Sequence, residues 1–291
     1  MKNVSLFLLI LFIIAACQKP VITLPPVISS PTDTLTRTDT LPPAVGADSI
    51  ACTPFAQSIR LQIDQTHFDS AFLQLPCSYK RENKLEKYPL LIFLNGVFEG
   101  SHYGTLQKMK KLGPSKFMLD SLRYSFMVNG KMENMIVVCP QSDNGYRLAA
   151  STNKIIDSMI ARYNVDTNRI YLTGLSAGAN SVLRYLTEKP EFAARIAAAV
   201  PMSTTFLDST HRSHFNYITN AGVPLYWYCG KQDKRYLGAN EAYVKTLNQL
   251  SPGLVTFALY NGEHRGWNPM YDPTHKRYNP NMYEWLLQHK K

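Results

Sequence analysis

The segment IYLTGLSAGANSVLRYL, residues 170–186, joins an apolar run directly to an amphipathic run through a turn that contains two glycines. β-Branched and aromatic residues are frequent in the apolar run, which is typical of a buried strand. After the turn, apolar side chains recur at helical spacing, at Ala179, Val182, Leu183 and Leu186. Gly174 and Gly178 each lie two positions from Ser176, where the strand and helix backbones crowd each other. The segment therefore predicts a strand followed at once by a helix, with the Ser176 hydroxyl projecting from the turn.

The rest of the chain repeats this alternation of strand-like and helix-like segments. The predicted strands are 67–79, expected to be antiparallel, and the apolar runs 90–96, 135–141, 169–174, 195–203, 223–230 and 254–262. The predicted helices are 150–164, the segment from the Ser176 turn to Lys189, 242–250 and 282–290. Such alternation predicts the α/β class, with a mostly parallel sheet, helices on both faces and chemistry at the carboxyl ends of the strands.

The first sixteen residues predict a signal peptide. Lys2 precedes the apolar run Val4–Ile14, which is too short to span a bilayer comfortably, and two alanines then lead to Cys17. A cysteine in that place resembles a bacterial lipoprotein signal, in which it is lipidated; an ordinary secretory signal is the alternative. We expect an exported protein anchored to a bacterial membrane through Cys17. The absence of Asp next to Cys17 favours the outer membrane, by resemblance to the general sorting rule.

The remaining chain is expected to form a tether and one domain. Residues 17–50 begin with the lipidated cysteine and are rich in Pro, Thr and Ser without any aromatic residue, so they cannot bury enough apolar surface to fold. Residues 51–291 are long enough for one α/β domain with a single core. The formal net charge is +10, a balance that favours anionic membranes or acidic glycans. The sequence lacks the alternation of basic and aromatic residues that would predict binding to nucleic acid.

Four cysteines follow Cys17. An exported protein can form disulfides, and a Cys52–Cys77 pair would join the N-terminal edge of the domain. Cys139 and Cys229 lie in apolar strand-like runs and are expected to be small buried hydrophobic residues. The Cys and His residues of the sequence are not spaced as the ligands of a metal site would be.

Ser176 needs a base to act as a nucleophile, because a serine hydroxyl is unreactive until its proton is removed. Of the seven histidines, only His264 lies on a short loop immediately after the last predicted strand. Asp233 follows the preceding strand and is the predicted carboxylate partner of His264, with Asp208 and Asp272 as alternative acids. The non-catalytic alternatives are that Ser176 is only a turn serine, His264 a surface histidine and Asp233 an ordinary loop carboxylate.

The loop NGVFEGSHYG, residues 95–104, is expected to complete the site from the end of the 90–96 strand. Stabilising an oxyanion needs two backbone N–H groups, which we assign to Ala177 and to Val97 or its neighbour Phe98. The residues predicted to line the substrate pocket are Asn95, Phe98, Tyr146 and Trp267.

With these residues in place, the chain from about His67 to its C-terminus resembles the α/β-hydrolase group of dienelactone-hydrolase-like enzymes, feruloyl and acetylxylan esterases, polyhydroxybutyrate depolymerases and predicted peptidases. The blocks that carry the resemblance are KYPLLIFLNG, VVCPQS, YNVDTNRIYLTGLSAGAN, PEFAARIAAAVPMS, CGKQD and GEHRGWN. The resemblance implies an α/β-hydrolase fold and a serine hydrolase that cleaves carboxylic esters without a cofactor, with plant-polysaccharide acyl or feruloyl esters as expected substrates. A serine peptidase on the same scaffold and a non-catalytic glycan- or partner-binding lipoprotein are the alternatives.

The sequence departs from that family's pattern at three places. Asn95 stands where the family usually has His, Ala179 where it often has a second Gly, and Cys229-Gly230 where it has His-Gly. None of these changes removes Ser176, Asp233 or His264. Asn95 borders the predicted oxyanion loop, and this keeps the non-catalytic alternative open.

Overall fold

The computed structural model describes residues 56–63, 68–119 and 123–291. The predicted signal peptide, the lipidated Cys17, the tether and Cys52 lie outside the described residues, so they and the Cys52–Cys77 pairing stay predictions. Within the described ranges, no helix is both long and apolar enough to cross a membrane. Cys139 and Cys229 are free and fully buried, as expected of small hydrophobic residues.

A mostly parallel sheet forms the centre of the described domain, which confirms the predicted α/β class. Its strands lie in the order β1-β2-β6-β3-β7-β8-β9-β10. Their bounds are β1 Gln57–Gln62, β2 Phe68–Gln74, β3 Tyr88–Leu94, β6 Ile136–Pro140, β7 Val165–Leu175, β8 Ala198–Met202, β9 Leu225–Gly230 and β10 Val255–Tyr260. β1 and β2 run antiparallel to each other and β2 runs antiparallel to β6, whereas the pairings from β6 to β10 are parallel. The carboxyl ends of β3, β7, β9 and β10 therefore meet at one edge.

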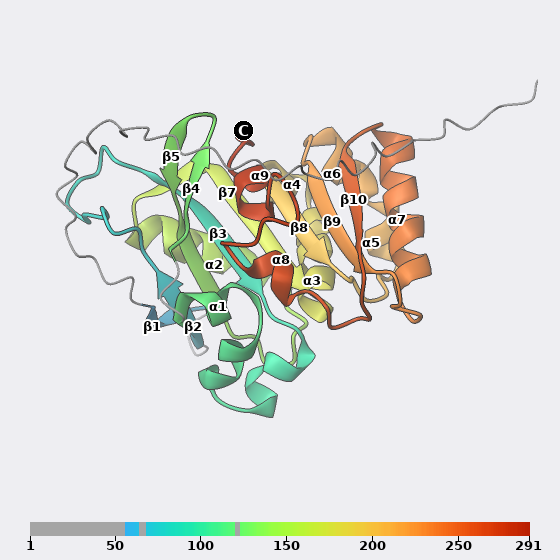
Figure 1. Ribbon diagram of the computed structural model, residues 1–291, viewed down its shortest axis with the longest axis horizontal. Coiled ribbons are helices and arrows are strands. Elements are labelled where there is room, and N and C mark those ends of the chain that lie inside the picture. The colour runs from blue at the N-terminus through green and yellow to red at the C-terminus, as the bar shows by residue number, and fades with distance from the viewer. Residues whose placement is uncertain (1–55, 64–67, 120–122) are drawn as a thin grey trace, which may run out of the picture. The chain divides into compact units, whose positions relative to one another are not determined.

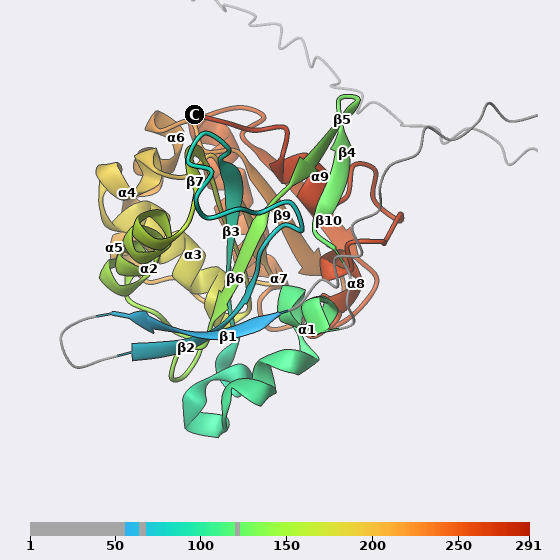
Figure 2. The ribbon, with the colours of Figure 1, turned by 90° about the vertical axis from the view of Figure 1, so that its left-hand side faces the viewer.

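The central strands are apolar throughout because both faces of the sheet are covered. Along β3, alternate side chains point to opposite faces. Leu90, Ile92 and Leu94 enter one buried cluster, and Leu91 and Phe93 enter the other. The predicted helices on both faces are confirmed, and Figure 2 shows the sheet between them.

Within the described domain, six helices cover one face of the sheet, and three helices and a hairpin cover the other (Figures 1 and 2). The first set is α2 Ala149–Arg162, α3 Ala177–Glu188, α4 Pro190–Ala194, α5 Ser209–Ser213, α6 Phe215–Asn220 and α7 Leu237–Leu250. On the other face lie α1 Gly113–Leu119, α8 Asn268–Tyr271, α9 Met282–Leu286 and the hairpin of β4 Ser125–Val128 and β5 Lys131–Asn134. Three 3₁₀ helices, η1 Val97–Glu99, η2 Ser101–Tyr103 and η3 Leu106–Lys111, lie between β3 and α1.

Apart from α9, the short elements on this second face and the three 3₁₀ helices were not predicted from the sequence. The hairpin had a usable signal, because Asn129 and Gly130 form its turn with φ values of 50° and 76°, a pair typical of two-residue hairpin loops. The last predicted helix, 282–290, is shorter in the structure because α9 ends at Leu286. The predicted helix 242–250 is longer, since α7 begins at Leu237.

Candidate active site

The Ser176 turn is a strained connection between β7 and α3. Ser176 has φ 55° and ψ −117°, a region that L-residues rarely adopt. Its N–H donates to the carbonyl oxygen of Met202 at 2.9 Å, which continues the pairing of β7 with β8 past the end of the strand. The sheet therefore holds the serine backbone in a strained conformation, which an unconstrained turn would not keep.

Gly174 and Gly178 are required by close backbone contacts on either side of this serine. A Cβ at Gly174 would lie 2.6 Å from the carbonyl carbon of Gly178. A Cβ at Gly178 would lie 2.0 Å from the carbonyl oxygen of Leu94 on β3. The crowding predicted from the sequence is therefore present on both sides of Ser176.

Ser176, His264 and Asp233 form a hydrogen-bonded relay. His264 Nε2 lies 2.8 Å from Ser176 Oγ, and His264 Nδ1 lies 2.7 Å from Asp233 Oδ2. Because a carboxylate only accepts, Nδ1 carries the proton and donates it to Asp233. The lone pair of Nε2 is then directed at the Ser176 hydroxyl, which is the arrangement that a general base requires.

Two aromatic rings hold the imidazole in this orientation. The His264 ring centroid lies 4.8 Å from that of Tyr236 and 5.1 Å from that of Trp267, the latter in an edge-to-face arrangement. Tyr236 comes from the loop that also carries Asp233, and its N–H donates to Asp233 Oδ1 at 3.2 Å. The same loop therefore orients His264 by a hydrogen bond and by ring packing.

The two predicted oxyanion donors both occupy the first position of a helix. Val97 begins η1 and Ala177 begins α3, so neither N–H has an acceptor within its own helix. Gly96 lies against the Ser176 turn, because a Cβ there would be 2.7 Å from Leu175 Cδ1. Gly145, with φ 83°, packs on the other side, where a Cβ would lie 2.5 Å from the Val97 nitrogen. The Val97 amide is thus fixed beside Ser176.

A cavity of about 450 Å³ opens above the relay. Ser176, Asp233 and His264 line it, and so do Val97 and three of the four predicted pocket residues, Phe98, Tyr146 and Trp267. Phe98 and Tyr146 are exposed, whereas Trp267 is buried. The Tyr146 hydroxyl contacts Thr205 Oγ1 at 3.2 Å across the cavity wall.

Asn95 does not line this cavity, which corrects its expected place among the pocket residues. Its side chain is fully buried, and its Oδ1 accepts hydrogen bonds from the N–H and the hydroxyl of Ser142, at 2.9 and 3.1 Å. Its Nδ2 donates to the Gly96 carbonyl at 2.8 Å. Asn95 therefore fixes the Gly96–Val97 backbone against the loop after β6, a structural task that needs both an acceptor and a donor.

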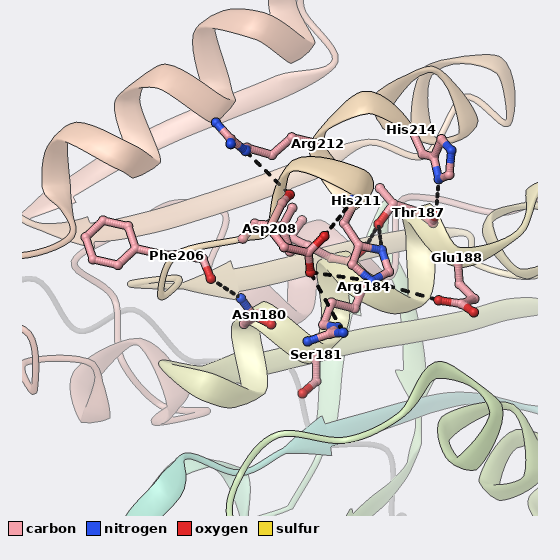
Figure 3. Close-up of polar contacts among 12 residues, drawn as sticks. Asn180, Ser181, Arg184, Thr187, Glu188, Phe206, Asp208, His211, Arg212 and His214 are labelled. Atoms are coloured by element: carbon pink, nitrogen blue, oxygen red, sulfur yellow. Dashed lines mark hydrogen bonds and ion pairs between the residues drawn. The ribbon is translucent and has the colours of Figure 1, made fainter.

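The alternative acids are engaged elsewhere. Asp208 caps α5, where its Oδ1 accepts from the His211 N–H at 3.0 Å and its Oδ2 lies 3.8 Å from Arg184 (Figure 3). Asp272 accepts from the N–H and the hydroxyl of Thr274 at 2.8 and 2.7 Å. Neither contacts His264. Among the described residues, no group of three or more His, Cys, Asp or Glu side chains is placed to hold a metal ion.

Sequence reasoning did not single out four residues that also line the cavity: Glu99, Arg235, Tyr236 and Arg265. Burial raises the pKa of the Glu99 carboxyl, and this effect is partly offset by a hydrogen bond from its own backbone N–H, by the charge of Arg265 and by a hydrogen bond from the Gly96 N–H. The available signal was position, because Arg265 directly follows His264 and because Arg235 and Tyr236 closely follow Asp233. Loop residues carry no periodicity that would have marked them.

The sequence matches no protein-family model and no curated protein. Its structure, however, is similar to solved structures. A thermostable esterase superposes with a TM-score of 0.59 at 21% identity, over 83% of this chain and 64% of the esterase. The fold is that of the α/β-hydrolases. An acylaminoacyl peptidase from Pyrococcus horikoshii gives a TM-score of 0.54 at 18% identity, over 81% of this chain and 42% of the peptidase. A ferulic acid esterase gives 0.50 at 14% identity, over 81% of this chain and 99% of that enzyme.

The domain spans less than two thirds of the thermostable esterase and less than half of the peptidase. At these identities the similarity establishes the fold. The activity must be argued from the side chains that this chain places at the carboxyl edge of its sheet.

Proposed function

We propose that the protein is a serine carboxylesterase. The observation that carries the proposal is the unbroken relay from Ser176 Oγ through His264 to Asp233, built at the ends of β7, β10 and β9. Chain order supports it, since Ser, Asp and His follow one another as they do in α/β-hydrolases that use such a relay. The non-catalytic alternative loses its motivation, because Asn95 lies outside the cavity and its replacement of histidine removes no reacting group.

In the proposed reaction, Ser176 Oγ attacks the ester carbonyl carbon while His264 Nε2 takes the hydroxyl proton. The N–H groups of Val97 and Ala177 donate to the oxyanion of the tetrahedral intermediate. The bond to the alcohol oxygen then breaks, and His264 returns the proton to the leaving alcohol. Water, deprotonated by the same imidazole, attacks the acyl-enzyme and releases the acid together with free Ser176. Asp233 stabilises the imidazolium through each proton transfer.

The exposed rings at the cavity mouth suit an ester attached to a sugar or to an aromatic acid. Phe98 and Tyr146 are exposed beside Ser176, Phe98 with the Arg265 guanidinium over one face of its ring, and exposed aromatic faces stack on sugar rings and on planar acyl groups. Esters that decorate plant polysaccharides, including feruloyl esters, are the substrate class we propose. A peptidase remains the second candidate, because the relay serves acyl transfer from amides equally well and an acylaminoacyl peptidase shares the fold.

Labelling with a fluorophosphonate probe tests the proposed nucleophile. Wild-type protein is expected to label at Ser176 and the Ser176→Ala variant to remain unlabelled. Ser181→Ala is the matched control, because Ser181 is a buried serine on the next turn of α3 whose hydroxyl donates to the Ala177 carbonyl. Equal labelling of wild type and Ser176→Ala would refute the proposal. Rates on p-nitrophenyl esters against peptide anilides then separate esterase from peptidase.

We also propose that the protein is exported and anchored to the outer membrane through a lipidated Cys17. The support is the sequence alone, namely the short apolar run followed by two alanines and a cysteine. The Pro-, Thr- and Ser-rich residues 18–50 would then act as a tether between the lipid and the catalytic domain.

A further inference from the structure

Two arginines flank the proposed catalytic histidine at the cavity mouth. Arg235 and Arg265 line the same cavity as Ser176, and both are exposed. The Arg265 guanidinium lies over the Phe98 ring, 5.0 Å from its centroid, and the Arg235 guanidinium lies 5.2 Å from the Tyr236 ring. Tyr236 packs on His264, and Arg265 directly follows His264 in the chain. The two cations therefore lie near the reaction centre and come from two different loops.

Neither guanidinium forms an ion pair within the described part of the chain. The ion pairs there join other residues, and no carboxylate lies within 4.0 Å of Arg235 or Arg265. Stacking on a ring occupies one face of a guanidinium and leaves its N–H edge free to bind. The mouth of the cavity therefore holds two guanidinium groups that are positioned by aromatic rings and have N–H donors free to bind a ligand.

The acidic groups of the cavity offset these charges only in part: the charge of Arg265 acts on the Glu99 carboxyl, but both acidic side chains are buried and neither forms an ion pair with an arginine. Asp233 is 2% exposed and uses its two oxygens on His264 and on the Tyr236 N–H. Glu99 is 9% exposed and its carboxyl is directed at the Gly96 N–H. An incoming ligand thus meets the arginines first, and the formal net charge of +10 adds a long-range attraction for anions.

We propose that the natural substrate is an acidic ester, whose carboxylate is held by Arg235 and Arg265 while Ser176 attacks the ester carbonyl. The planar fork of arginine matches a carboxylate through two parallel hydrogen bonds, which gives orientation as well as affinity. The carboxylate belongs either to the acyl group or to the alcohol, and both sources present the same chemistry to the two guanidinium groups. This inference rests on the proposed esterase function.

Two pairs of esters test the inference, each pair differing only in a carboxylate or its uncharged amide. In the acyl pair, p-nitrophenyl adipate monoester is compared with p-nitrophenyl adipamate. In the alcohol pair, 4-(carboxymethyl)phenyl acetate is compared with 4-(carbamoylmethyl)phenyl acetate. Wild type is expected to prefer the carboxylate in one pair by about 10-fold in kcat/KM, through a lower KM, and added salt is expected to weaken that preference. The responding pair identifies which side of the ester carries the charge.

Substitution of the arginines is expected to remove the preference in steps. Arg235→Gln and Arg265→Gln should each lower the carboxylate-to-carboxamide ratio about 3-fold, and the double variant should bring it close to 1. Lys234→Gln is the control, because Lys234 is an exposed neighbour of Arg235 that does not line the cavity. It changes the net charge by the same amount and should keep the wild-type ratio.

The outcomes separate this inference from the proposed function. If Ser176-dependent hydrolysis of the carboxamide esters occurs but wild type shows no carboxylate preference, the esterase stands and the acidic substrate is refuted. A preference that survives in the double variant, or that Lys234→Gln lowers as much, also refutes the role of the arginines. Hydrolysis of none of the four esters contradicts the esterase itself, and the acidic-ester inference fails with it.

Discussion

Asp233 accepts hydrogen bonds through both of its carboxylate oxygens. One comes from His264 Nδ1 at 2.7 Å and the other from the Tyr236 backbone at 3.2 Å. An amide in place of the carboxylate keeps the size of the side chain but introduces an NH₂ group that can only donate. That group next to His264 would favour the imidazole tautomer with its proton on Nε2, which is unable to accept from Ser176.

Asp233→Asn is therefore expected to lower kcat on a neutral p-nitrophenyl ester by about 10⁴-fold with little change in stability. Steady-state kinetics and urea unfolding measure the two quantities. The control is Asp208→Asn, since Asp208 caps α5 and asparagine caps a helix as well as aspartate does. Loss of activity in Asp208→Asn equal to that in Asp233→Asn would contradict the assignment of Asp233 as the third member of the relay.

At the scale of elements, the Ser176 turn depends on three backbones meeting in a small space. β7, α3 and the end of β3 converge there, and Gly178 of α3 sits directly against the Leu94 carbonyl. Helix propensity disfavours glycine within a helix by about 1 kcal/mol relative to alanine. Close packing of the helix against the sheet therefore outweighs local preference at this position.

Gly178→Ala is expected to destabilise the domain by about 3 kcal/mol, because the added Cβ would overlap the β3 backbone. Urea unfolding followed by tryptophan fluorescence measures the change. Gly238→Ala in α7 is the matched control, since a Cβ there meets nothing within 4 Å. That variant should be more stable than wild type by about 0.5 kcal/mol. Equal stability of the two variants would contradict the packing argument.

The elements that could be predicted from the sequence are those whose side chains report burial. The central strands were found because both of their faces are covered, and α2 and α3 were found because each has one apolar stripe. β1 was missed because only one face of it packs on the domain, so most of its residues are exposed. The short helices around the site were missed because segments of three to seven residues are too short to show a helical period.

Over the whole molecule, the site residues from Gly96 to Trp267 come together because parallel strands end at one edge of the sheet. Topology explains why Ser176, Asp233 and His264 could be predicted from their places after three strands. The cavity wall could not be predicted in the same way. Burial of Asn95 and exposure of Arg235 and Arg265 depend on how neighbouring loops pack, and no periodic pattern in the sequence reports that.

Because the whole site lies within one domain, anchoring and catalysis are expected to be separable. Cys17→Ser removes the proposed lipid attachment point, so the protein should move from the membrane pellet to the soluble fraction and lose incorporation of labelled palmitate. Its kcat/KM on a soluble ester should equal that of wild type, since the residues that line the cavity all lie between Gly96 and Trp267. Ser30→Ala in the tether is the control and should stay in the membrane pellet with full labelling. Retention of Cys17→Ser in the pellet would show that something other than a lipid on this cysteine holds the protein there.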